Sequence, residues 1–191
     1  LGTTTRLGGF PALAIQQIFF QQTLVLGLIL LVRPRQLLTT VTAFTLAHSI
    51  TLAAASLGGI TLPGPPVEII IAMSIALLGA EAIYRSRGRE TLSQRKPWLI
   101  AFGFGLVHGF GFAGALSEIG LPKGAEVLAL LLFNLGVEAG QVAFVCAVLL
   151  LVFLTTRLAR LPLAPARYVA AYTIGIVGAY WAIERIVNVL V

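Results

Sequence analysis

Charged residues are scarce in this sequence, and aspartate is absent altogether. Only 10% of the 191 residues are charged, whereas 58% are hydrophobic. A soluble domain carries about a quarter charged residues, so the composition excludes one and favours a chain embedded in a lipid bilayer. The net charge of +6 does not indicate nucleic-acid binding, because the Arg and Lys residues lie at the ends of apolar segments, as in membrane proteins.

Cysteine is equally scarce, since Cys146 stands alone within an apolar run. A single cysteine permits no internal disulfide and no set of thiolate metal ligands. The His-Glu-x-x-His and Gly-x-Ser-x-Gly patterns of hydrolases are also missing, so we predict that the protein is not an enzyme. The sequence begins at Leu1 rather than at Met, which leaves room for a signal peptide or an amino-terminal domain ahead of it.

Long apolar runs separated by short breaks rich in proline, glycine and arginine make up the rest of the chain. Each run reaches the roughly 20 helical residues that cross a bilayer. We therefore predict one all-α integral membrane domain over residues 1–191, a bundle of about six transmembrane helices at 10–32, 36–57, 66–84, 97–116, 125–155 and 165–189. The fifth segment is long for one crossing, so we expect tilt or a protruding end.

The positive residues are distributed unevenly between the two ends of this predicted bundle. One end holds ten of them: Arg33, Arg35, Arg85, Arg87, Arg89, Arg95, Lys96, Arg157, Arg160 and Arg167. The other end holds only Arg6, Lys123 and Arg185. Because cytoplasmic loops carry the excess of Lys and Arg, we predict that both termini are extracytoplasmic, in a multi-pass protein of a bacterial inner membrane.

Several polar residues fall at membrane depth, where a charged side chain costs about 3 kcal/mol on insertion scales. In the segment 36–57, helical spacing places Thr42, Thr45, His48 and Ser49 on one face. The hydroxyls can orient the imidazole of His48. This face fits either a metal ligand or proton relay, or a histidine that bridges helices by hydrogen bonds.

The segment 97–116 carries the second histidine, His108, among glycines. Gly105 and Gly109 form a GxxxG pair, which lets helix backbones approach closely. The glycines serve either packing alone or the provision of space around His108 for a ligand.

The segment 125–155 places Asn134, Glu138 and Gln141 on one helical face. Glu138 lies mid-helix and is the most costly residue of the chain if ionised, so it is protonated, paired with a cation or histidine, or exposed to water. We predict a functional role for it.

Other polar residues have simpler interpretations. Glu81 is spaced to pair with Arg85 one helical turn away, and Gln17 and Gln21 suit hydrogen bonds between helices. Glu184 and Arg185, next to Tyr180 and Trp181, indicate an ion pair at the membrane interface.

Two histidines and one or two glutamates on separate helices suit a divalent transition-metal cation. We predict His48, His108 and Glu138 as metal ligands. The side chains that would orient them are Thr45, Ser49, Asn134, Gln141 and Glu81.

Four stretches of the sequence resemble the HupE/UreJ family of membrane proteins associated with hydrogenase and urease. They are Thr42–Ser49, Phe102–Gly109, Phe133–Gln141 and the closing Tyr180–Arg185. The resemblance implies a nickel or cobalt permease, with the ion as cargo, in the branch where an extracytoplasmic domain precedes the bundle. Members of the family usually carry Asp-His in the first helix, where this chain has Gln21 and Gln22.

The leading hypothesis is therefore a divalent-metal binding or transport protein with its site among the second, fourth and fifth predicted helices. The alternative is a non-transporting accessory subunit that docks a larger membrane complex, which the loss of acidic and histidine residues from the first helix favours. The expected partners are the lipid bilayer and either such a complex or further copies of the chain, without nucleic acid.

Overall fold

The computed structural model describes residues 6–60, 62–122, 124–158, 160 and 162–190, with the side chains of 6–15, 115 and 117–119 left aside. Lys123, counted above among the positive residues, lies outside the described residues. The described structure is helical: α1 (Arg6–Leu31), α2 (Pro34–Gly58), α3 (Gly64–Ser86), α4 (Leu92–Arg95), α5 (Pro97–Ile119), α6 (Glu126–Phe153), the π-helical turn η1 (Leu154–Leu158) and α7 (Leu163–Leu190). The predicted all-α class is confirmed.

The six long helices correspond to the six predicted segments, with ends that differ by at most four residues. Prolines begin or closely follow the start of several of them, such as Pro34 in α2 and Pro97 in α5, because a first-turn proline has no hydrogen bond to lose. α6 runs on through η1, so the apolar stretch Glu126–Leu158 extends beyond the predicted end at residue 155.

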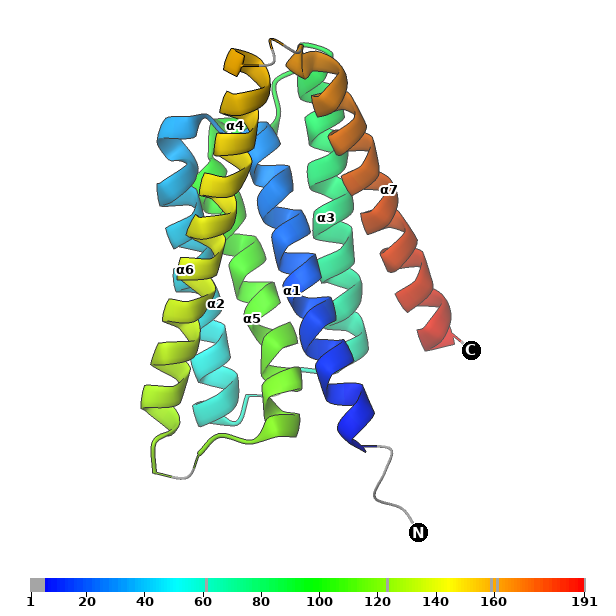
Figure 1. The fold of residues 1–191 in the computed structure, drawn as a ribbon. Coiled ribbons are helices and arrows are strands. Elements are labelled where there is room, and N and C mark those ends of the chain that lie inside the picture. The colour runs from blue at the N-terminus through cyan, green and yellow to red at the C-terminus, as the bar shows by residue number, and fades with distance from the viewer. Residues whose placement is uncertain (1–5, 61, 123, 159, 161, 191) are drawn as a thin grey trace.

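Five helices are long and apolar enough to cross a membrane, namely α2, α3, α5, α6 with η1, and α7. In α1, the apolar part with described side chains is the shorter stretch Gln16–Leu31. The start of α1 and the end of α7 lie toward the same end of the bundle, and the arginine-bearing links lie at the opposite end (Figure 1). The chain is thus a multi-pass membrane protein by architecture.

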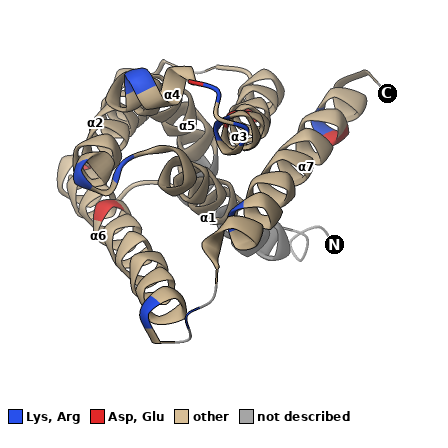
Figure 2. Cartoon of the chain, turned by 90° about the horizontal axis from the view of Figure 1, so that it is seen from above, with Lys and Arg blue, Asp and Glu red and all other residues tan. Residues whose placement is uncertain are grey.

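α1 runs through the middle of the bundle and contacts every helix from α2 to α7 (Figures 1 and 2). Phe20, Leu24 and Leu28 on its inner face are almost fully buried. The ring of Phe20 packs edge-on against Trp181 of α7, with centroids 4.4 Å apart. Close van der Waals packing of this apolar face therefore fixes α1 among its neighbours.

Glycines bring two pairs of helices into backbone contact. α5 lies along α2, and α7 lies along α3. A Cβ added at Gly79 would overlap the backbone of Gly175, and one at Gly178 would overlap the backbone of Ala76. Lipid tails are as apolar as the helix surfaces, so helices in a membrane associate through close packing, and small residues at the crossings allow it.

The short helix α4 was not predicted from the sequence, and it explains Glu81. The Glu81 carboxylate accepts hydrogen bonds from the backbone N–H groups of Leu92 (3.2 Å) and Ser93 (3.1 Å). Arg85, the expected partner of Glu81, instead donates to the carbonyl oxygen of Leu30 at 2.6 Å. Glu81 thus holds the α3–α5 link in place by satisfying free N–H groups at the start of α4.

An ion pair joins α3 to α7 at the end of the bundle where α1 begins. Arg185 Nε lies 2.7 Å from Glu68 Oε2, and Arg185 Nη1 lies 3.0 Å from Glu184 Oε2. The Arg185 guanidinium also lies over the ring of Phe20, 6.0 Å from its centroid. The pair with Glu184 agrees with the interpretation from the sequence, whereas Glu68 adds a link between helices.

We expect Glu68→Gln to lower the thermal unfolding midpoint of the detergent-solubilised protein more than Glu184→Gln does. Glu68 ties two helices together, whereas Glu184 is next to Arg185 on the same helix. A hydrogen bond to a charged group contributes about 1.5–3 kcal/mol, and partial exposure of Glu68 reduces this to about 1 kcal/mol. Equal midpoints for the two variants would contradict this role of Glu68.

Candidate functional site

A row of polar side chains, here called the polar seam, joins α2 to α6. Thr42 Oγ1 donates to Glu138 Oε1 at 3.0 Å, Thr45 Oγ1 donates to Gln141 Oε1 at 3.0 Å, and His48 Nδ1 lies 3.3 Å from Asn134 Oδ1. The two helices are antiparallel neighbours, so residues one turn apart on each face meet across the interface. The fold therefore brings together the faces that helical spacing predicted separately.

Asn134 determines which nitrogen of His48 carries the proton. Its amide Nδ2 donates to the carbonyl oxygen of Leu130 at 2.9 Å, which turns Oδ1 toward His48. Because Oδ1 only accepts hydrogen bonds, Nδ1 of His48 is the donor and Nε2 carries the lone pair. A neutral imidazole oriented through its other nitrogen is the form in which histidine binds metals.

The lone pair on His48 Nε2 has no partner among the described residues. His48 is fully buried, and Nε2 makes no hydrogen bond to any described residue. The amide Nε2 of Gln141, which is also buried, likewise makes no hydrogen bond to any described residue. Buried polar atoms nearly always have partners, so His48 Nε2, an acceptor, indicates a place for a cation or a hydrogen-bond donor, whereas Gln141 Nε2, an amide donor, suits an acceptor such as a water molecule.

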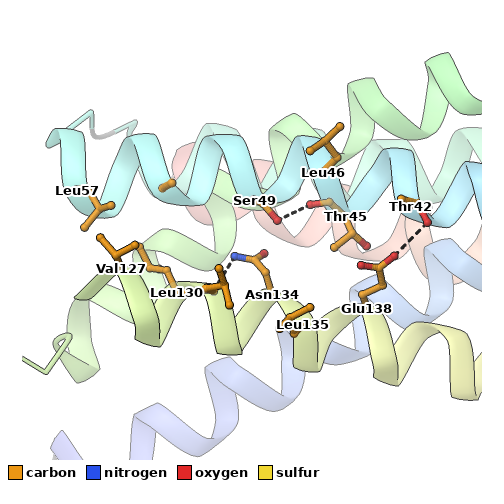
Figure 3. A pocket seen from close by; sticks show the side chains of 12 residues that line it. Thr42, Thr45, Leu46, Ser49, Leu57, Val127, Leu130, Asn134, Leu135 and Glu138 are labelled. Carbon is orange, nitrogen blue, oxygen red and sulfur yellow. Dashed lines mark hydrogen bonds between the residues drawn. The ribbon is translucent and has the colours of Figure 1, made fainter. Parts of the chain in front are cut away.

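A groove of about 370 Å³ runs between α2 and α6 beside the polar seam (Figure 3). Leu57 and Val127 line one end, near the start of α6, and Thr42 and Glu138 line the other end. Between them Asn134 borders the groove, with His48 behind it. Ser49 also borders the groove and donates to the carbonyl oxygen of Thr45 at 2.7 Å.

His108 contacts the polar seam only indirectly. Its Nε2 lies 3.4 Å from Ser74 Oγ of α3. The Ser74 hydroxyl already donates to the carbonyl oxygen of Ile71 at 2.6 Å, so His108 Nε2 is the donor and Nδ1 carries its lone pair. The ring of Phe44 contacts both imidazoles, with centroids 5.4 Å from His108 and 6.1 Å from His48.

The glycines around His108 lie against α2. A Cβ at Gly105 would overlap the carbonyl oxygen of Phe44 and the side chain of Ala47, and one at Gly109 would overlap Thr51 and the carbonyl oxygen of His48. The two glycines thus let the α5 backbone lie directly on the turn of α2 that carries His48. This contact positions His108 relative to His48 by close helix packing.

The predicted polar site residues lie in three places. Thr45, His48, Asn134, Glu138 and Gln141 meet along the polar seam with Ser49 beside them, whereas His108 lies toward α3 and Glu81 caps α4. Among the described residues, no three His, Cys, Asp or Glu side chains gather closely enough to hold a metal ion together. The role of His48, His108 and Glu138 as metal ligands stays a prediction.

Two contacts were not singled out from the sequence. Phe44 and Phe112 pack against the imidazole of His48, and the latter ring lies edge-on with centroids 5.3 Å apart. Phe44 precedes His48 by one helical turn, so helical spacing could have identified it.

On α1, the amide of Gln17 faces α5 near Gly111, while Gln21 Nε2 and Gln22 Oε1 are buried without partners among the described residues.

Comparison with known proteins identifies the family of this chain. No curated protein and no solved structure matches the chain. A family model described as "HupE / UreJ protein" matches residues 17–185, which is most of the chain and includes the whole polar seam. The protein therefore belongs to the HupE / UreJ family.

Proposed function

We propose that this protein carries a divalent transition-metal ion, nickel or cobalt, through the membrane by way of the polar seam. The observation that carries the proposal is the state of His48: it is fully buried and held by Asn134, and no described residue contacts the lone pair on its Nε2 through a hydrogen bond. Imidazole suits nickel and cobalt among the first-row metals. Membership of the HupE / UreJ family supports the same class of cargo.

In this proposal Glu138 supplies the negative charge and His48 the nitrogen ligand, while Gln141 and Thr45 orient their neighbours. The ion passes through a loosely ligated position rather than a closed site. An ion in transit must bind strongly enough to enter and weakly enough to leave. In this proposal a site with only two protein ligands, His48 and Glu138, meets that requirement. His108, in contact with Phe44 on the far side, provides a second neutral imidazole nearby.

The groove suggests a direction of entry. Its apolar end, at Leu57 and Val127, lies at the end of the bundle where α1 begins, opposite the arginine-rich links (Figure 1). If the arginine-rich end faces the cytoplasm, as the positive-inside rule requires, the groove opens from the extracytoplasmic side of a bacterial inner membrane. Glu138 then stands at its inner end, where a carboxylate draws in cations.

The test is uptake of radioactive nickel and of cobalt into vesicles that contain the purified protein. We expect uptake above that of protein-free vesicles, and competition between the two ions. Thr40→Val serves as the matched control, because Thr40 is buried on α2 but bonds only to the carbonyl oxygen of Gln36; it should transport normally. No uptake of either ion by a monodisperse preparation would overturn the proposal.

A second candidate, a non-transporting accessory subunit, is favoured by one observation. His48, His108 and Glu138 do not gather into a single cluster in the described structure. An accessory subunit would copurify with partner chains in fixed stoichiometry when extracted gently from its native membrane, and it would show no uptake in vesicles. These two measurements distinguish the candidates.

A further inference from the structure

Two pockets lie side by side at the arginine-rich end of the bundle, away from the polar seam. The first has a volume of about 280 Å³ and is bordered by Arg33, Arg85 and Arg95. The second has a volume of about 230 Å³ and is bordered by Arg85, Arg167 and Tyr168. Arg85 borders both pockets and is the residue that they share.

The four arginines come from parts of the chain that only the fold brings together. Arg33 precedes α2, Arg85 lies in the last turn of α3, Arg95 ends α4 and Arg167 lies in the first turns of α7. Figure 2 looks down on this end and shows Lys and Arg at the links between helices. Like charges repel one another, so gathering four arginines at one end of the bundle costs free energy unless an anion is bound.

Acidic side chains offset only part of this charge. Glu90 is the one acidic residue that borders either pocket within the described chain, and it pairs with Arg95 at 3.0 Å. Both side chains of that pair are more than two-thirds exposed, at 69% and 77%, so the pair is weak. Arg85 is anchored by its bond to the carbonyl oxygen of Leu30, and among the described residues its guanidinium makes no other hydrogen bond or ion pair.

The surroundings combine positive charge with apolar surface. Leu30, Ala82 and Ala164 border the second pocket beside the arginines. Tyr168 and Ser86 also border this pocket, and the Tyr168 hydroxyl donates to the carbonyl oxygen of Ser86 at 3.2 Å. The first pocket alone could hold about nine water molecules at roughly 30 Å³ each, which is room for a phosphate group and the glycerol attached to it.

We propose that these two pockets bind the phosphate-bearing headgroup of an anionic phospholipid. Arginine forms bidentate hydrogen bonds with phosphate, and basic pockets between transmembrane helices on the cytoplasmic side suit such headgroups. The apolar residues in the second pocket continue from the headgroup toward the acyl chains. The pockets lie at the ends of membrane-spanning helices, which is the level at which lipid headgroups are found. A lipid is therefore the expected source of the phosphate.

The experiment compares binding of phosphatidylglycerol with that of phosphatidylcholine, by native mass spectrometry of the intact protein after titration with each lipid. We expect a clear preference for phosphatidylglycerol, reduced about tenfold or more in the double variant Arg33→Gln/Arg167→Gln. Neither residue has a hydrogen bond or ion pair in the described structure that the substitution would break, so folding should be retained; a monodisperse elution profile checks this.

The matched control is Arg35→Gln/Arg157→Gln, which removes the same charge at the same end from exposed residues outside both pockets. It should change the lipid preference less than twofold. An equal loss in both double variants would show a general surface attraction and overturn the proposal. Displacement of the lipid by inorganic phosphate at millimolar concentration would assign the pockets to a free anion and would also overturn it.

Discussion

His48→Ala is expected to reduce nickel and cobalt uptake to the level of protein-free vesicles. The substitution removes the buried Nε2 lone pair on which the proposed transit position depends. Losing a residue that merely orients a metal ligand costs about 10–100-fold in affinity, and losing the ligand itself should cost more. The measurement is the initial rate of uptake in vesicles that contain equal amounts of each variant.

Two companion variants separate metal binding from folding. His48→Gln keeps a polar side chain of similar size and should also abolish uptake, although it can still pair with Asn134. Asn134→Leu leaves the imidazole in place but removes its orienting partner, so we expect a fall of about 10–100-fold. The control Thr40→Val should transport normally. Full uptake by both His48 variants would exclude His48 as a ligand.

Gly109→Ala is expected to destabilise the bundle strongly. The added methyl group would overlap Thr51 and the carbonyl oxygen of His48, so α5 would have to move away from α2. Overpacking of this kind costs about 1–3 kcal/mol, sometimes more. The thermal unfolding midpoint of the solubilised protein should therefore fall, and any protein that still folds should show altered metal uptake because the turn carrying His48 is displaced.

The matched control for this prediction is Gly140→Ala on α6. A Cβ at Gly140 meets no described atom within 4 Å. Because glycine costs about 1 kcal/mol relative to alanine inside a helix, this variant should unfold at the same temperature as the parent or slightly higher. If Gly109→Ala and Gly140→Ala behaved alike, close contact between α5 and α2 would not be needed for stability.

Hydrophobic runs and helix periodicity were sufficient to predict the six long helices and the polar faces on two of them. Spacing within a helix states which side chains share a face, so Thr45 with His48, and Asn134 with Glu138 and Gln141, could be grouped from the sequence. Spacing does not state which faces meet. A common site for His48 and Glu138 was predicted from residue type and family resemblance, whereas the pairs that join α2 to α6 were visible only in the structure.

The remaining differences have the same physical origin. Glu81 was assigned to Arg85 because local pairing is the only pairing a helical pattern shows, yet its carboxylate reaches the N–H groups of Leu92 and Ser93 in α4. His108 was grouped with His48 by residue type. Its contact with Ser74 on α3 depends on the crossing of helices distant in sequence, and a single sequence carries no record of that crossing.

The central position of α1 has a consequence for how the protein is made. During translation α1 enters the bilayer before any of the helices that later surround it exist. The helices that bury Gln17 and Gln21 in the finished bundle are all synthesised later, and the partner of Phe20, Trp181, lies in the last of them. The contact between the first and the last long helix can therefore form only after α7 has been synthesised, so the packing around Phe20 is completed last.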